Sequence, residues 1–367
     1  MSGPERSNGP APGAGAAGGA GPAGSPRVSR RALLAGGAAL LASLRPVQAE
    51  APAHGTAARA PYVIYMITYR GETEVEQGFR DYFAQRQIPV DLVVRDIGRD
   101  VSRVPGLIDE IRRLKPDLVY TWGTPVTLAT VGRWDKPDPQ KYITDIPVVF
   151  TMVAAPVAAG VVPSLASSGR NVTGAFHVVP LDAQMRAMQA YRPFDALGVL
   201  YSRSEPNSVA LVAELQTVAE QMQFRLDARP FAANAAGQPV ADGVPAMIAD
   251  MKATGTDWLY LLPDTFLGTI YDITKPAAAA VRLPAFGAAE LSIRSGGALA
   301  GLVCRYYSVG QLAASKAEAI LTGGQPASDV PVETLKRFSL IINMPVAAEL
   351  DLYPPLAMLN YAEVISG

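Results

Sequence analysis

The sequence predicts an α/β protein with two similar lobes, each built on a parallel sheet. Two observations predict this fold class. Short apolar runs, typical of strands buried on both faces, alternate along the chain with amphipathic stretches of about ten to fourteen residues. One strand–helix–strand pattern then occurs twice, in the same order. Because such alternation forms parallel sheets with right-handed crossovers, we expect each copy to form one lobe, with a cleft between the two.

The first copy begins with the apolar run 118–122 and ends with the run 146–151. Between them, Gly123, Thr124 and Pro125 form a turn into a helix. Thr124 fits the N-cap, and Pro125 fits the first helical position, where a missing N–H costs nothing. Loops that follow parallel strands lie at the edge of the sheet where ligands bind. This turn is therefore a candidate binding loop.

The second copy consists of the runs 257–262 and 283–287, with Pro263, Asp264 and Thr265 in its turn. In each copy an aspartate opens the earlier run and a proline stands near the start of the later one. These two residues are 30 positions apart in the first copy and 27 in the second. Chance similarity between buried strands is the alternative, and two matches in the same order argue against it.

The other elements follow from hydrophobic periodicity and from Pro and Gly boundaries. In the stretch 74–87, for example, Val75, Phe79 and Phe83 fall on one helical face. Further strands are expected at 62–68, 89–96, 170–176, 196–201, 224–228, 298–303 and 340–343, and further helices at 104–114, 181–191, 209–222, 244–253 and 309–321.

The N-terminus has the layout of an export signal. Residues 1–26 are almost entirely Gly, Ala, Pro and Ser, which predicts a disordered tail. Residues 27–49 combine basic residues, an apolar stretch and a small-residue cleavage site near Ala49, which predicts a signal peptide. The pair Arg30 and Arg31 favours twin-arginine export, with an ordinary signal as the alternative. A flexible leader is expected at 50–60, and the mature protein is expected in the periplasm.

Composition excludes several classes of function. The chain has 367 residues, 49% of them hydrophobic, and a formal charge of -1, which leaves no basic footprint for nucleic acid. Cys304 is the only cysteine, so no internal disulfide can form, and the chain has only two histidines. No phosphate-binding loop follows a strand, and no G-x-S-x-G motif occurs. We therefore expect no metal, no cofactor and no enzyme activity, and a monomer.

Ten short motifs occur in the order found in one family. Taken in that order, the chain resembles the tryptophan/tyrosine type of ABC-transporter substrate-binding protein over about residues 61 to 355. The motifs are K-P-D-L-V (115–119), G-T-P (123–125), I-P-V-V-F (146–150), R-N-V-T-G (170–174), G-V-L-Y-S-R-S-E-P-N-S (198–208), D-W-L-Y-L-L-P-D-T (257–265), L-P-A-F-G (283–287), G-A-L-A (297–300), I-L-T-G-G-Q-P (320–326) and L-I-I-N (340–343).

This resemblance implies the type I periplasmic-binding-protein architecture, with two Rossmann-like lobes joined by three crossover strands. It assigns 61–175 and 298–328 to lobe one, and 176–297 and 329–367 to lobe two. It also implies the function: the protein captures a small polar ligand, amino-acid-like or otherwise carboxylate-bearing, and delivers it to an ABC permease in the inner membrane.

The resemblance also implies a set of ligand-binding positions in the loops after the strands. Ala155 stands where the family often has Asp, which points to a ligand specificity that departs from the family's. The positions are Thr68, Tyr69, Arg70, Thr124, Pro125, Ala154, Ala155, Ser202, Glu205, Asn207, Ser208, Asp264, Thr265 and Glu290.

Side-chain chemistry gives several of these residues a role. A ligand carboxylate would be held by Arg70 and by the helix that starts near Thr124. Asp264, Glu205 or Glu290 would pair with a cation. Tyr69, Tyr201 or Trp122 would stack on a planar group. Ordinary structural roles are the alternatives: a solvated loop charge for Arg70, core packing for Trp122, a helix cap for Asn207 or Ser208, and a surface charge for Glu290.

Two other functions remain open at this level. A periplasmic sensor that presents its closed form to a membrane-bound signalling partner would have the same sequence features. An exported α/β enzyme would use Asp264 and Glu290 as acid and base. Neighbouring genes would separate transport from signalling, and turnover of a substrate would identify an enzyme.

Overall fold

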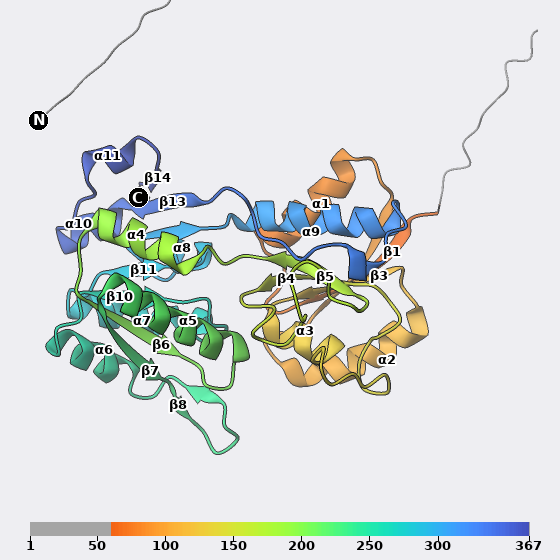
Figure 1. Cartoon of the computed structure of the whole chain (residues 1–367), viewed down its shortest axis with the longest axis horizontal. Helices are drawn as coiled ribbons and strands as arrows, with labels where there is room; N and C mark the ends of the chain where they lie inside the picture. The colour runs from red at the N-terminus through yellow and green to blue at the C-terminus, as the bar shows by residue number, and fades with distance from the viewer. Residues whose placement is uncertain (1–59, 367) are drawn as a thin grey trace, which may run out of the picture. The chain divides into compact units, whose positions relative to one another are not determined.

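The computed structural model describes residues 60–366. The predicted tail (1–26), the predicted signal peptide (27–49) and the predicted leader, apart from residue 60, lie outside the described residues. Within that part of the chain, the strands form a five-stranded sheet, a seven-stranded sheet and a two-stranded hairpin, with helices interleaved (Figure 1). The predicted α/β fold class is confirmed.

The five-stranded sheet is parallel throughout, in the order β2-β1-β3-β4-β5. β3 and β4 are buried at every residue because helices cover both faces of the sheet. The strands are β1 (Tyr62–Thr68), β2 (Val90–Asp96), β3 (Leu118–Trp122), β4 (Val148–Val153) and β5 (Val172–Phe176).

Helices cover both faces of this sheet (Figure 1). One face carries α1 (Glu74–Gln85) and α9 (Tyr306–Leu321), and the other carries α2 (Val104–Leu114) and α3 (Thr124–Val131). The backbones of α1 and α9 approach closely at glycines. A Cβ built on Gly310 would lie 1.9 Å from the carbonyl oxygen of Val75. Helix α9 therefore packs tightly against α1 on this face of the five-stranded sheet. Short 3-10 turns lie at Val101–Arg103 and Ala327–Asp329.

The seven-stranded sheet has the order β14-β13-β12-β11-β10-β6-β7, parallel except between β12 and β13. Its strands are β6 (Ala196–Tyr201), β7 (Arg225–Pro230), β10 (Trp258–Leu261), β11 (Ala285–Gly287), β12 (Ala300–Val303), β13 (Ser339–Asn343) and β14 (Glu363–Ile365), and the hairpin is β8 (Ala232–Ala233) with β9 (Pro239–Val240).

The helices of this second part of the fold connect those strands. They are α4 (Leu181–Tyr191), α5 (Pro206–Met222), α6 (Val244–Ala253), the 3-10 turn Leu267–Thr269, α7 (Tyr271–Ala280), α8 (Glu290–Arg294), α10 (Met344–Leu350) and α11 (Leu356–Leu359). None of the helices among residues 60–366 is long and apolar enough to cross a membrane.

The repeat predicted from the sequence is present in the hydrogen bonds of the sheets. Asp117 opens β3, and its Oδ2 accepts from the N–H of Val63 at 2.8 Å. Asp257 opens β10, and its Oδ2 accepts from the N–H of Ala196 at 3.0 Å. Each aspartate thus bonds to the start of the neighbouring strand in its sheet, which is β1 for Asp117 and β6 for Asp257. This shared role explains why an aspartate stands at the start of both runs.

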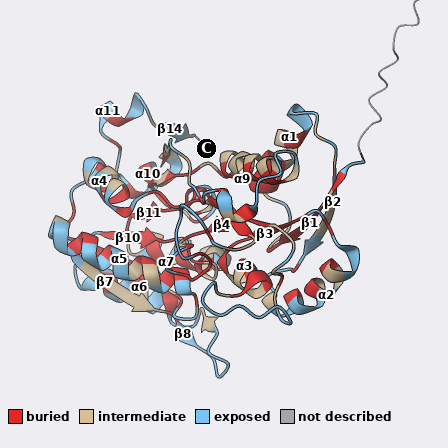
Figure 2. Cartoon of the chain, turned by 45° about the vertical axis from the view of Figure 1, so that its right-hand side comes forward, coloured by how far each residue is buried: buried red, intermediate tan, exposed pale blue. Residues whose placement is uncertain are grey.

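Two separate apolar cores match the two sheets, and the chain crosses between the sheets three times within the described residues. One core gathers around β1, β3, β4 and α9, the other around β6, β10, β11 and α4. In Figure 2, β3, β4, β10 and β11 are buried along their length. The crossings are 177–180, 304–305 and 334–338. We call the five-stranded sheet with its helices lobe one, and the seven-stranded sheet with its helices lobe two.

The sheet topology corrects one predicted lobe boundary. The family resemblance assigns 298–328 to lobe one, yet β12 pairs with β11 and β13 inside the seven-stranded sheet. The chain therefore enters lobe one after Val303, with α9. Sequence periodicity does not show which neighbours a buried strand pairs with, so this boundary depends on the tertiary fold.

The predicted helix caps are shifted in both binding loops. Gly123, with a φ of 82°, is the N-cap of α3, and Thr124 is already its first helical residue. Glu205 is the N-cap of α5, so Asn207 and Ser208 lie inside the first turn instead of capping it. Neither helix has a side-chain cap among residues 60–366. The amides of both first turns are therefore left to other partners.

Candidate functional site

A cavity of about 50 Å³ lies between loops of the two lobes. Lobe one contributes loops after β1, β3 and β4, and lobe two contributes the loop after β10 and the start of α5. These are the carboxyl ends of parallel strands, where ligands bind in such folds. The lining residues are Arg70, Trp122, Thr124, Met152, Ala154, His177, Asn207, Pro263, Asp264, Thr265, Gly268, Tyr271, Ala289, Leu291 and Tyr306.

Lobe one presents a stack of cation and aromatic rings to the cavity. The rings of Tyr69 and Trp122 are 5.8 Å apart and nearly parallel, at 8°. The guanidinium carbon of Arg70 lies 4.8 Å from the centre of the Trp122 ring. Trp122 is only 7% exposed, and its Nε1 has no hydrogen-bond partner among the described residues. A buried indole N–H without a partner is costly, so this donor is available to a ligand.

The start of α3 adds further donors beside this stack. Thr124 lines the cavity, and its hydroxyl oxygen accepts weakly from the N–H of Ala154, at 3.4 Å. That hydroxyl therefore supports the neighbouring loop and does not cap its own helix. The uncapped first turn of a helix attracts negative charge through its free amides.

Lobe two presents oxygen acceptors to the same cavity. Asp264 is 5% exposed; its Oδ2 accepts from the Ser202 N–H at 2.7 Å and its Oδ1 from the Leu267 N–H at 2.9 Å. Asn207 donates to the Pro263 carbonyl at 3.2 Å. The Oδ1 of Asn207 is buried and finds no partner within residues 60–366. The two walls are thus complementary, with donors on lobe one and acceptors on lobe two.

Glu205 lies beside Asp264 at the border of the cavity. Its carboxylate accepts from the N–H groups of Thr265 at 2.9 Å and Phe266 at 3.1 Å. Burial, followed by the nearby Asp264 carboxylate, raises the pKa of Glu205 to about 7. Glu205 lines a neighbouring groove of about 740 Å³ together with Tyr69 and Phe266. Thr265 lines both spaces, so the cavity and the groove are neighbours.

Two residues in or next to the crossings lie in the cavity wall, and the sequence did not indicate them. His177 follows β5 and Tyr306 begins α9, and their rings meet edge to face at 6.4 Å. Burial, followed by the charge of Arg70, lowers the pKa of His177 to about 4, so the imidazole is neutral at pH 7. Its Nδ1 has no partner in the described part of the chain. The positions of both residues just after predicted strands were a usable signal.

Six of the predicted ligand-binding residues line the cavity: Arg70, Thr124, Ala154, Asn207, Asp264 and Thr265. Tyr69, Pro125 and Glu205 line the neighbouring groove, with Thr265 shared between the two spaces. Besides His177 and Tyr306, the sequence did not indicate six further lining residues, namely Met152, Pro263, Gly268, Tyr271, Ala289 and Leu291.

The other predicted positions line neither space and make contacts inside the lobes. Thr68 is fully buried and donates to Asp96 at 3.2 Å. Ser202 donates two hydrogen bonds to the Asp264 carboxylate, one from its N–H and one from its hydroxyl. Glu290 forms ion pairs with two arginines. Ala155 and Tyr201 pack against the core of lobe two, and Ser208 is fully buried in α5.

No group of three or more His, Cys, Asp and Glu side chains among residues 60–366 is arranged to hold a metal ion. The chemistry of the cavity is that of recognition: a fixed cation, unpartnered donors and acceptors, and aromatic rings. Figure 1 shows the two sheets whose loops supply these groups.

Comparison with known proteins identifies relatives of the chain. The tyrosine-binding protein of Clostridioides difficile is 28% identical over 239 residues, which are 65% of this chain and 64% of that relative. The match thus spans less than two thirds of the relative's length.

Solved structures share the fold. A conserved domain protein from Vibrio cholerae superposes with a TM-score of 0.72 at 23% identity, covering 84% of this chain and 100% of that chain. An ABC domain from Streptococcus pneumoniae in complex with L-Trp gives a TM-score of 0.69 at 22% identity, covering 82% and 100%. The family model described as ABC transporter substrate binding protein matches residues 74–365. That match covers most of the chain, and the chain therefore belongs to the ABC transporter substrate-binding protein family, whose members bind small ligands.

Proposed function

We propose that this chain is a periplasmic solute-binding protein that captures a small carboxylate-bearing ligand between its lobes and delivers it to an ABC permease. The observation that carries the proposal is the wall of lobe one. Arg70, Trp122 and Thr124 line one cavity there, and they bring a guanidinium, a buried indole N–H without a partner in the described chain and the start of an uncapped helix. All three favour a negatively charged group.

The opposite wall supports a ligand that also carries a hydrogen-bond donor. The Oδ1 of Asn207 has no partner within residues 60–366, and the Asp264 carboxylate lies in the same wall. An amine or a hydroxyl on the ligand would satisfy these acceptors. A ligand with both groups would bridge the two lobes, which stabilises a closed arrangement relative to an open one.

Size and apolar surface support a ligand with a ring. The cavity itself has room for only a few water molecules. The adjoining groove is larger, and Tyr69 and Phe266 lie in its wall. The curated relative is a tyrosine-binding protein, and the pneumococcal structure contains L-Trp. L-tyrosine and L-tryptophan are therefore the first probes to test.

Export and delivery rest on the sequence and the family. Residues 27–49 have the layout of a signal peptide, which would place the cleft outside the cytoplasm. Binding proteins of this family operate with ABC transporters, so the closed, loaded form is what a permease would receive.

The test is ligand-dependent thermal stabilisation. L-tyrosine, L-tryptophan, tyramine (which lacks the carboxylate) and 3-(4-hydroxyphenyl)propionate (which lacks the amine) form a matched panel. At a hundredfold excess over Kd, binding adds about 2.7 kcal/mol, a rise in Tm of a few degrees. We expect the carboxylates to stabilise the protein and tyramine to have no effect. Equal stabilisation by tyramine would contradict the carboxylate site, and turnover of a probe would contradict the binding-protein function.

A matched pair of variants ties the result to the cavity. Arg70→Met should weaken binding of the carboxylate probes by roughly ten- to a hundredfold, because charge-assisted hydrogen bonds contribute about 1.5 to 3 kcal/mol. Arg186→Met removes an exposed guanidinium on α4 that lines neither the cavity nor the groove, and it should leave binding nearly unchanged. Equal losses in the two variants would mean that general positive charge, not the cavity, attracts the probe.

A further inference from the structure

We infer that Glu290 positions Tyr306 in the cavity wall and thereby joins lobe two to the helix of lobe one that touches the ligand. This inference rests on the proposed function, because it assigns the cavity a ligand-binding role. It departs from the sequence prediction, which placed Glu290 among the residues that contact the ligand.

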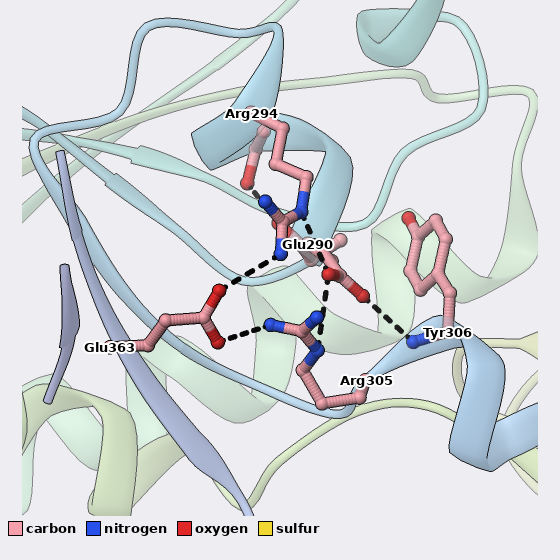
Figure 3. A network of polar contacts seen from close by, with 7 residues as sticks. Glu290, Arg294, Arg305, Tyr306 and Glu363 are labelled. Carbon is pink, nitrogen blue, oxygen red and sulfur yellow. Dashed lines mark hydrogen bonds and ion pairs between the residues drawn. The ribbon is translucent and has the colours of Figure 1, made fainter. Parts of the chain in front are cut away.

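Glu290 is the acceptor for three groups on two elements (Figure 3). It is the first residue of α8, and its side chain is 2% exposed. Its Oε1 lies 2.8 Å from Arg294 Nε and 3.2 Å from Arg305 Nε. Its Oε2 accepts from the backbone N–H of Tyr306 at 2.8 Å. Contacts to both oxygens of a buried carboxylate hold it in one orientation.

The N–H of Tyr306 is one of the amides that a helix cannot satisfy from within. Tyr306 is the first residue of α9, and Arg305 at the N-cap provides no side-chain cap in the described chain. Glu290 reaches across from α8 to supply the missing acceptor. A carboxylate at a helix start also interacts favourably with the helix dipole. Glu290 thus caps α9 from a different lobe.

The position of Glu290 in the chain connects this cap to the cavity. The residues on either side of it, Ala289 and Leu291, line the cavity, and so does Tyr306. One buried carboxylate therefore holds together two stretches of the cavity wall. A shift of α8 relative to α9 would move three lining residues at once.

The two helices belong to different lobes. Helix α8 packs on β11 and β12 of the seven-stranded sheet. Helix α9 packs on α1 of lobe one, and the two backbones approach closely at Gly310. Between them lies the crossing 304–305, so the bonds from Glu290 to Arg305 and Tyr306 span a joint between the lobes. Any rotation that closes the cleft must keep or remake these bonds.

Glu363 provides a natural comparison within the same cluster. It lies on β14, and its carboxylate bonds Arg294 at 3.1 Å and also bonds Arg305 (Figure 3). It shares both arginines with Glu290 and, within residues 60–366, forms no hydrogen bond with Tyr306. Removing either carboxylate leaves the arginines, about a third exposed, able to regain water, so both variants should fold.

The experiment measures backbone hydrogen exchange at Tyr306 in the ligand-free mature protein. We expect Glu290→Ala to raise the exchange rate of that amide at least tenfold and Glu290→Gln, which keeps one acceptor oxygen, to raise it less. Glu363→Ala should leave the rate within about twofold of the wild type. Amides of β10 serve as the control for general loosening and should be unchanged in all three variants.

A second arm measures the Kd of L-tyrosine by titration calorimetry on the same proteins. The Kd should rise about tenfold in Glu290→Ala, partly recover in Glu290→Gln and stay near the wild type in Glu363→Ala. If Glu363→Ala increases exchange at Tyr306 as much as Glu290→Ala, or if neither variant changes it, the inference is wrong. If the wild type fails to bind L-tyrosine while exchange follows the expected order, that ligand is excluded from the proposed function and the positioning role of Glu290 is supported.

Discussion

Replacing Glu205 with Gln tests whether the buried acid at the edge of the cavity holds its proton at neutral pH. Burial and the adjacent Asp264 carboxylate raise the pKa of Glu205 from its ordinary value of 4.5 to about 7. Below pH 4.5 the folded and the unfolded chain both carry this proton. Between pH 4.5 and 7 the unfolded chain loses the proton while the folded chain keeps it, so the free energy of unfolding falls as pH rises.

The expected size follows from the shift. Each pH unit corresponds to about 1.4 kcal/mol, so the wild type should lose about 3 kcal/mol relative to Glu205→Gln between pH 4.5 and 8. The variant also changes the hydrogen bonds to the Thr265 and Phe266 amides, which adds a constant offset at every pH. The test therefore uses the pH dependence of the difference in unfolding free energy between the two proteins, and not the absolute value of that difference.

The assay is urea unfolding of both proteins at several pH values between 4 and 8. Taking the difference removes the contribution of His177, whose lowered pKa acts in the opposite direction and destabilises the fold as pH falls from 6.5 toward 4. A difference in unfolding free energy that is flat across this pH range would refute the reasoning, because Glu205 would then be ionised equally in both states.

Two further predictions concern packing and recognition. Gly310→Ala should lower the free energy of unfolding by about 1 to 3 kcal/mol, because its Cβ would lie 1.9 Å from the Val75 carbonyl oxygen, whereas Gly106→Ala meets open space in α2 and should be neutral or slightly stabilising. Chemical denaturation measures both, and equal effects would contradict the close contact of α1 and α9. Trp122→Phe keeps an aromatic ring but loses the indole N–H, so the Kd of L-tyrosine should rise about tenfold with little change in Tm; an unchanged Kd would show that this donor does not reach the probe.

Much of the fold follows from local sequence. The run 118–122, the helix 104–114 and the helix 181–191 were predicted with the bounds that the structure has, because continuous apolar runs and Pro boundaries are local signals. Helix α7 was missed because Pro276 lies inside it, and α11 and β14 were missed because they are short.

The candidate site was predictable where a residue follows a strand directly. Arg70, Thr124 and Asp264 lie in loops at the carboxyl ends of β1, β3 and β10, and all three line the cavity. Ser202 follows β6 in the same way, yet it turns to the Asp264 carboxylate and lines neither space. A loop position fixes where the backbone of a residue lies, whereas the partner of its side chain depends on what packs against it.

The sequence by itself determined the α/β class, the doubled strand–helix–strand unit and the family. Hydrophobic periodicity, Pro and Gly boundaries and the order of the motifs are all properties of the linear sequence. Only the tertiary structure decided which sheet β12 joins, that His177 and Tyr306 reach the cavity, and that Glu290 binds arginines and a helix start. These features depend on contacts between residues far apart in sequence. Glu290 and Glu363, for instance, are 73 positions apart and share the same two arginines. No local sequence pattern predicts such shared ion pairs, because they form only once the two sheets have folded and the chain has crossed between them.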